Sequence, residues 1–142
     1  MLIGSFNHSI DEKGRMIFPV KFRDEMGESM LVTRWRDGCL AVFTQDEFMK
    51  MYTKMNEKSE SEDEDVTEFA RTLLSGTCEV EPDKQGRIMI PADLRIQAGI
   101  TKDVVVAGIM NRAEIWDKER WATRNNTSDN DRFDQLMRKL KL

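Results

Sequence analysis

The chain has 142 residues, of which 26 are acidic and 22 are basic, so its net charge is −4 with the single histidine neutral. This length forms one or two small domains, and an isoelectric point near 5.2 argues at first against a nucleic-acid-binding domain, because such domains tend to be basic. The sequence has no apolar run near the ~20 residues of a membrane-spanning helix and no signal-peptide pattern, so we expect a soluble, cytoplasmic protein that does not associate with membranes.

The first predicted elements are two short strands over residues 6–10 and 15–18. Between them, Asp11 can accept backbone N–H groups and Gly14 can adopt a positive φ, which is typical of a type I turn followed by a bulge that closes a tight hairpin. Pro19 cannot donate to a strand ladder and suits the first turn of a helix, so a short helix is expected over about residues 20–26.

Two further strands are predicted near residues 30–35 and 39–43, with Asp37-Gly38 as the turn between them. Thr44 and Glu47 have the spacing of a capping box, which begins an amphipathic helix. A second helix is predicted over residues 62–75, and Gly76 ends it.

The most informative feature is an internal repeat. Residues 11–23 read DEKGRMIFPVKFR and residues 83–95 read DKQGRIMIPADLR. The paired positions are Asp11/Asp83, Gly14/Gly86, Arg15/Arg87, Ile17/Met89, Pro19/Pro91, Phe22/Leu94 and Arg23/Arg95. The chain is therefore predicted to contain two copies of one unit of roughly 45 residues, near residues 5–49 and 77–121.

The second copy repeats the predicted elements, with a helix at about 92–98 and strands near 103–109 and 112–116. Asp117 is placed to cap the helix that follows, and a last apolar stripe is formed by Phe133, Leu136, Met137 and Leu140. A unit of this size seldom folds unaided. We therefore expect the copies to share one core, as a β-rich domain with pseudo-two-fold symmetry and helices outside.

The two repeated arginines are not explained by the turns. The turn is a sufficient explanation of Asp11 and Asp83 with their glycines, but no hairpin requires an arginine directly after the bulge. One interpretation of Arg15 and Arg87 is an ion pair with the aspartate of the same turn. The other is contact with phosphates and base edges, for which the planar guanidinium is suited. Both can hold, because an aspartate that orients the arginine also preorganises it.

The paired D-x-x-G-R…P…R motif resembles that of the bacterial MraZ family, which is built on the AbrB-like swapped-hairpin fold. The resemblance covers almost the whole chain, including the N-terminal LIGSFNHSIDEKGR and the later EIWDKERW. It implies an α+β fold that is a duplicated AbrB-like swapped-hairpin β-barrel with peripheral helices. The implied division is a first half at residues 1–55, an acidic linker and helix at 56–75, and a second half with a C-terminal helix at 76–142.

The same resemblance implies a sequence-specific DNA-binding transcriptional regulator of the division and cell-wall gene cluster. Its implied partners are double-stranded DNA, at short direct repeats in the promoter of its own operon, and further copies of itself in a homo-oligomeric ring associated with the nucleoid. The DNA-binding residues implied are Asp11, Lys13, Arg15, Asp83, Lys84 and Arg87, with Gly14 and Gly86 forming the turns. Lys13 has Gln85 as its counterpart, and Lys84 lies one place earlier, so the two lysines are not equivalent.

The low isoelectric point does not exclude DNA binding, because the acidic residues are concentrated in one segment of the chain. Residues 1–55 carry eight basic and eight acidic groups, whereas residues 56–68 carry one basic and seven acidic groups. The acidity is thus concentrated between the copies. It is interpreted as a solvated loop and helix start, where acidic groups favour the positive end of the helix dipole. The alternative is a regulatory or partner-binding patch held away from the DNA.

Two other functions compete with DNA binding as interpretations of the sequence. An antitoxin-like AbrB relative would bind a toxin, but that function normally needs a long tail after a single hairpin unit. In this chain the unit is duplicated and the tail is short. An enzyme could use Asp11 and Asp83 with the arginines, but no nucleophile–base pair accompanies them. Because His8 is the only histidine and Cys39 and Cys78 are 39 residues apart, no metal site is predicted. We expect no catalytic activity, no cofactor and no small-molecule substrate.

Overall fold

The computed structural model describes residues 1–61 and 63–142. Glu62, at which the second central helix is predicted to begin and which belongs to the acidic segment 56–68, lies outside the described residues. In the described part the chain is an α+β protein, as predicted. Its strands are β1 (Ser5–Ser9), β2 (Arg15–Ile17), β3 (Met30–Arg34), β4 (Leu40–Thr44), β5 (Cys78–Val80), β6 (Arg87–Met89), β7 (Asp103–Ile109) and β8 (Arg112–Asp117).

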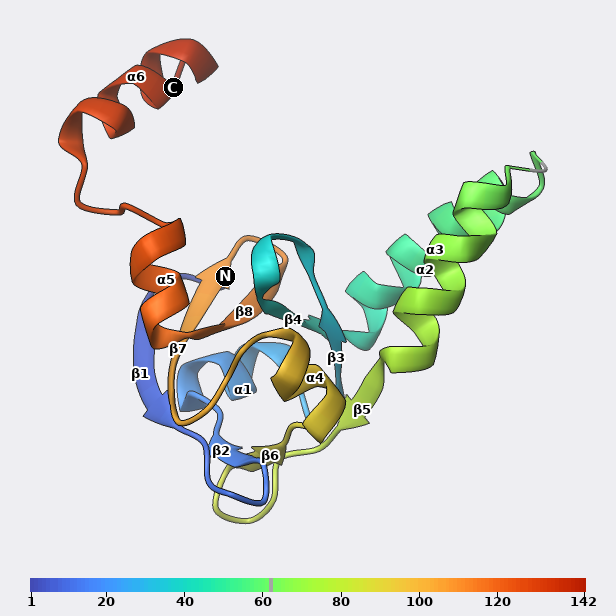
Figure 1. The fold of residues 1–142 in the computed structure, drawn as a ribbon, viewed down its shortest axis with the longest axis horizontal. Helices are drawn as coiled ribbons and strands as arrows, with labels where there is room; N and C mark the ends of the chain where they lie inside the picture. Colours follow the sequence, from blue (N-terminus) through green and yellow to red (C-terminus); the bar gives the residue numbers. More distant parts are fainter. Residues whose placement is uncertain (62) are drawn as a thin grey trace.

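The helices of the described residues follow the order expected from the sequence (Figure 1). They are α1 (Val20–Met26), α2 (Gln45–Ser59), α3 (Glu64–Gly76), α4 (Ala92–Gln97), α5 (Lys118–Arg124) and α6 (Asn130–Leu140), with a short 3-10 turn at Arg36–Gly38. Local chemistry sets several of their starts. Pro19 and Pro91 precede α1 and α4, the Thr44 hydroxyl accepts the N–H of Glu47, and the Asp117 carboxylate accepts the N–H of Arg120.

Six strands form one antiparallel sheet in the order β1-β7-β8-β4-β3-β5, and β2 and β6 pair separately as a two-stranded sheet. The pairings are symmetric between the two halves of the chain. β1 pairs with β7, and its counterpart β5 pairs with β3, so the first strand of each half adds to the sheet beside strands of the other half. The strands β4 and β8 meet in the middle, and β2 pairs with its own counterpart β6.

The predicted closed barrel is not seen among the described strands. The six-stranded sheet is open, with β1 and β5 at its edges, because β2 and β6 bond to each other instead of continuing the larger sheet. Only an isolated bridge between Ile10 and Met16 links the first strands locally.

Helices cover both faces of the six-stranded sheet, because successive strand residues point to opposite sides. On one face Val42, Val106 and Ile115 belong to the main core, with Phe22 of α1 and Leu94 of α4. On the other face two smaller clusters form, in which Phe43 packs with Phe48 of α2, and Trp116 packs with Trp121 of α5. The sheet is therefore a middle layer between helices, and β2 and β6 lie at one end of it (Figure 1).

Two parts of the chain project from this body (Figure 1). The antiparallel hairpin of α2 and α3 extends from one side, and α6 stands away from the opposite side. The start of α3 agrees with the first interpretation of the acidic segment, because the Asp63 carboxylate accepts the N–H of Asp65 and Glu64 lies in the first turn. None of the helices in the described part has the length and apolar character needed to cross a membrane.

Candidate nucleic-acid interface

The first repeated turn is closed by a network around Asp11. The backbone N–H of Asp11 donates to the carbonyl of Arg15 at 2.9 Å, and the N–H of Gly14 donates to the carbonyl of Asp11 at 3.0 Å. Carboxylate atom Oδ1 of Asp11 accepts the N–H groups of Lys13 and Arg15, each at 2.9 Å. Gly14 has φ +87°, which an L side chain rarely adopts. The predicted turn hydrogen bonds are confirmed, but the predicted hairpin is wrong: β1 pairs with β7 and β2 pairs with β6, so the turn does not join two strands of one ladder.

The second turn has the same geometry around Asp83. Its Oδ1 accepts the N–H groups of Gln85 and Arg87 at 2.9 Å, and Gly86 has φ +78°. Gln85 thus occupies the place that Lys13 has in the first turn. The Lys84 side chain is exposed, like that of Lys13, and neither has a hydrogen-bond partner among the described residues.

Each arginine is held by the aspartate of its own turn. Nε of Arg15 donates to Oδ2 of Asp11 at 2.8 Å, and Nε of Arg87 donates to Oδ2 of Asp83 at 2.8 Å. The ion-pair interpretation is therefore confirmed, and it leaves the terminal Nη groups of both guanidinium groups without a protein partner among the described residues. The arginine side chains keep 35% and 33% of their surface exposed, so these Nη groups are placed to meet a ligand.

Hydrogen bonds lower the pKa of both aspartates. For Asp11 the largest cause is the backbone N–H of Arg15, followed among the favourable interactions by the Arg15 guanidinium. The backbone N–H and guanidinium of Arg87 lower the pKa of Asp83 in the same order. Each donor stabilises the charged carboxylate. Both turns therefore keep an ionised carboxylate against the arginine at neutral pH, which fixes the direction of the guanidinium.

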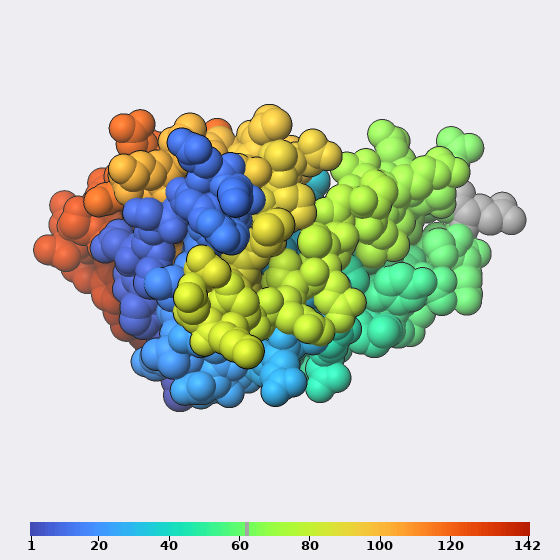
Figure 2. All heavy atoms as spheres, turned by 90° about the horizontal axis from the view of Figure 1, so that it is seen from below, coloured from blue at the N-terminus to red at the C-terminus, as the bar shows by residue number. Residues whose placement is uncertain are grey.

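The two turns are joined into one surface by the β2–β6 pairing. Arg15 lies opposite Met89, and Ile17 lies opposite Arg87. The N–H of Ile90 also donates to the carbonyl of Gly14 at 2.8 Å, and the N–H of Phe18 donates to that of Gly86 at 3.0 Å. Figure 2 shows this end of the molecule, where the dark blue first turn and the yellow-green second turn lie side by side.

Two apolar residues share this surface with the arginines. Ile17 and Met89 are 47% and 55% exposed, whereas Met16 and Ile88 between them and the arginines are buried. Alternation along a strand explains the pattern, because residues two apart point to the same face. Sequence reasoning recorded the match of Ile17 with Met89 but did not assign them to the interface. The signal that could have assigned them is the apolar residue two places after each arginine, because on a strand it faces the same side as the arginine.

A second pair of arginines, Arg23 and Arg95, packs against the glycines of the two turns. Nε of Arg23 donates to the carbonyl of Phe18 at 3.0 Å, and its guanidinium lies against Gly86 of the other half. Arg95 makes the equivalent bond to Ile90 at 3.1 Å and lies against Gly14. The sequence repeat includes both arginines, but no residue near either arginine in the sequence indicates that it contacts the turn of the opposite half.

The two cysteines and the histidine lie outside this interface. Cys39 is buried, and burial raises the pKa of its thiol to about 12. Cys78 is half-buried, and neither thiol forms a disulfide. Partial burial lowers the pKa of His8 on β1. The described side chains contain no cluster of three or more His, Cys, Asp or Glu residues that could hold a metal ion.

The fold and this surface define the class: an α+β protein whose two halves interlock and present matching arginine-bearing turns at one end. Comparison with known proteins gives its family. The model of the family described as "MraZ protein, putative antitoxin-like" matches twice, over residues 1–70 and 73–142. The chain belongs to the MraZ family.

Curated relatives match over most of their own length. The transcriptional regulator MraZ of Thermoanaerobacter sp. (strain X514) is 44% identical over 91% of this chain and 90% of its own. That of Clostridium beijerinckii is 41% identical over 99% of this chain and 96% of its own. The protein of the same name from Ligilactobacillus salivarius is 46% identical over 85% of this chain and 84% of its own.

Proposed function

We propose that this chain is a transcriptional regulator that binds double-stranded DNA in a sequence-specific manner through the paired turns. The observation that carries the proposal is the placement of Arg15 and Arg87 on one face of the β2–β6 pair, diagonally across from each other, with each fixed at Nε by an ionised aspartate. A guanidinium held in this way presents its Nη groups in a set direction, which suits bidentate contact with guanine or with phosphate oxygens. The names of the relatives support the regulatory role.

The lysines and the apolar pair have different parts in this proposal. Lys13 and Lys84 are exposed beside the turns, and their flexible stems suit phosphate contacts that position the protein without reading sequence. Ile17 and Met89 lie between the arginines, where an apolar side chain can contact a thymine methyl group or a sugar. Asp11 and Asp83 act through the arginines that they orient.

We also propose that the chain is a duplicated swapped-hairpin unit, with halves at residues 1–55 and 76–142 joined by the acidic linker and helix at 56–75. The symmetric strand pairings support this division, as do the two separate matches of the family model. The acidic hairpin projects to the side of the body rather than toward the turns (Figure 1), which keeps its charge away from a duplex bound there.

Family resemblance supplies the rest of the proposal. We propose short direct repeats in the promoter of the chain's own operon, within the division and cell-wall gene cluster, as the target, and a nucleoid-associated homo-oligomeric ring as the binding form. Assembly would raise affinity, because one subunit offers few cationic groups and linked subunits engage successive repeats at high effective concentration.

Chromatin immunoprecipitation of the tagged protein in its own cells tests this function. We expect enrichment at the promoter of its own operon, over DNA that contains short direct repeats, and loss of that enrichment in Arg15→Ala/Arg87→Ala. The control Lys54→Ala/Arg124→Ala removes two positive charges elsewhere and should keep the enrichment. Equal profiles for all three proteins, or no enriched promoter, would contradict the proposal.

A further inference from the structure

The C-terminal helix α6 presents an apolar face without a partner in the described chain. Phe133, Leu136, Met137 and Leu140 have helical spacing on one side and are 37–62% exposed. Figure 1 shows α6 standing apart from the sheet and the other helices. An isolated helix of 11 residues is marginally stable in water, because helix nucleation is costly. The face therefore indicates a docking helix.

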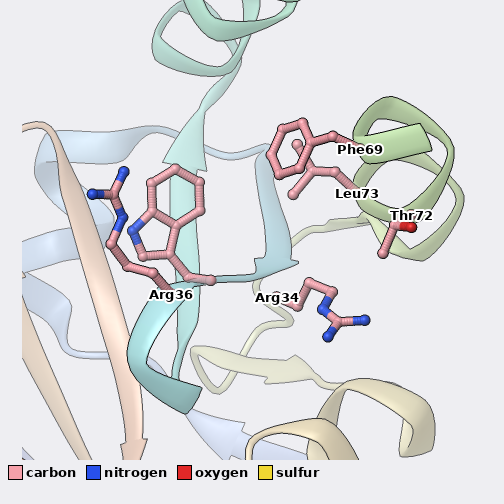
Figure 3. A pocket seen from close by; sticks show the side chains of 6 residues that line it. Arg34, Arg36, Phe69, Thr72 and Leu73 are labelled. Carbon is pink, nitrogen blue, oxygen red and sulfur yellow. The ribbon is translucent and has the colours of Figure 1, made fainter. Parts of the chain in front are cut away.

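An apolar groove that could receive this helix lies between the second half of α3 and the segment that follows β3. It has a volume of about 310 Å³ and is lined by Trp35, Phe69 and Leu73, with Arg34 and Arg36 at its rim. Figure 3 shows Phe69 and Leu73 pointing from α3 into the groove, with Arg34 and Arg36 around it. Phe69 is 52% exposed, which is large for a phenylalanine on a surface that has no partner.

The charges of the two surfaces are complementary in one orientation only. The start of α6 carries Asp129, Asp131 and Asp134, and its end carries Arg138, Lys139 and Lys141. The start of α3 is acidic at Glu64, Asp65 and Glu68, whereas the arginine rim lies near its end. Arg132 on α6 and Arg71 on α3 are the exceptions to the pattern. If α6 lies antiparallel to α3, the acidic start of α6 lies near the arginines at the end of α3, and the basic end of α6 lies near the acidic start of α3.

The lengths of the two helices agree with such a contact. α6 has 11 residues and α3 has 13, which correspond to about 16 and 20 Å at a rise of roughly 1.5 Å per residue. Phe133 would then enter the groove beside Phe69, while Leu140 would lie along the first turns of α3. The apolar anchors are spaced as in other helices that dock in grooves.

We propose that α6 of one copy of the chain docks antiparallel along α3 of a second copy, with Phe133 in the groove between Trp35 and Phe69. The two surfaces lie on opposite sides of the body (Figure 1), so each copy offers its helix to one neighbour and its groove to the other. Such a head-to-tail contact closes into a ring when its rotation allows. The inference rests on the self-assembly part of the proposed function and names the surface that performs it.

Disulfide trapping tests the contact directly. The variant Phe69→Cys/Phe133→Cys is made in a Cys39→Ala/Cys78→Ser background and oxidised, and the products are separated without reductant. We expect a ladder of covalently linked copies that continues beyond the dimer. The control Phe69→Cys/Gln135→Cys, with the second thiol on the far side of α6, should give little product. A closed monomer, dimers alone or no product would overturn the proposal.

Charge reversal provides a second test that does not depend on new thiols. Asp134→Lys and Arg34→Glu should each lower the mass of the assembly measured by light scattering, and mixing the two variants should restore it. Unchanged masses would contradict the contact. Binding to a duplex with one repeat should survive in these variants, whereas Arg15→Ala/Arg87→Ala should keep its mass and lose that binding, so the two proposals fail separately.

Discussion

The guanidinium group of Arg23 closes over Gly86, the turn glycine of the opposite half of the chain. A Cβ atom at Gly86 would lie 2.5 Å from Cζ of Arg23, and one at Gly14 would lie 2.5 Å from the carbonyl oxygen of Ile90 and 3.1 Å from Nε of Arg95. Each arginine-bearing turn is therefore positioned by the other half. Because each turn contacts the other half of the chain, we expect the stability of the fold and the recognition of a ligand by the turns to depend on the same contacts.

We predict that Gly86→Ala destabilises the protein by at least about 1–2 kcal/mol, because an L residue with a left-handed backbone is strained and the new methyl group displaces Arg23. Urea unfolding measures the change. Gly76→Ala is the control, since no heavy atom lies within 4 Å of its Cβ position; it should leave stability unchanged or raise it by up to about 1 kcal/mol.

Arg23→Ala should reduce the cost of Gly86→Ala. Without the guanidinium, the methyl group at residue 86 has room, and only the backbone strain remains. A double-mutant cycle measured by urea unfolding should therefore give a coupling energy of about 0.5 kcal/mol or more, the range found for residues in contact. Strict additivity would show that the two groups do not touch in solution.

Acid should weaken the protein through Asp11 and Asp83. Their folded pKa values lie below the ordinary 3.8, so their contribution is complete at higher pH and is lost as the pH falls through the folded value. We expect the urea midpoint to fall more steeply in the natural sequence than in Asp11→Asn/Asp83→Asn as the pH drops from about 5 to below the ordinary pKa of 3.8. Parallel curves would contradict the assignment.

The exposed apolar pair should contribute to DNA affinity. Ile17→Ser/Met89→Ser removes apolar surface between the arginines, and we expect about a tenfold loss of affinity for the natural promoter duplex in fluorescence anisotropy. The fold should persist, since both side chains are about half exposed. Met49→Ser/Met110→Ser, at exposed positions on α2 and after β7, serves as the matched control and should bind like the natural sequence.

Local signals predicted much of this fold. Pro19 and Pro91 marked the starts of α1 and α4, and the Asp-x-x-Gly turns have the expected hydrogen bonds. These elements are set by residues a few places apart, so their chemistry is readable from sequence. The ion pairs within the turns were also foreseen as one of two interpretations of Arg15 and Arg87.

The long-range pairings had no such signal. The partners Met16 and Ile88 are far apart in sequence, and nothing local shows that β2 and β6 bond to each other and leave the larger sheet open. The contact of Arg23 with Gly86 follows from that pairing, so it was missed as well. The whole-chain charge was misleading for a related reason: acidic residues of the α2–α3 hairpin outweigh a near-neutral body, while the proposed interface depends on two guanidinium groups.

The most direct measurement is an equilibrium titration of the natural promoter duplex at several salt concentrations. For Arg15→Ala/Arg87→Ala we predict a loss of affinity of at least about tenfold and a slope of log K against log salt that is shallower by roughly 0.9 per phosphate contact removed. Lys54→Ala/Arg124→Ala, with the same change in net charge, should match the natural sequence. Equal affinity and equal slope for all three proteins would contradict DNA recognition by the paired turns.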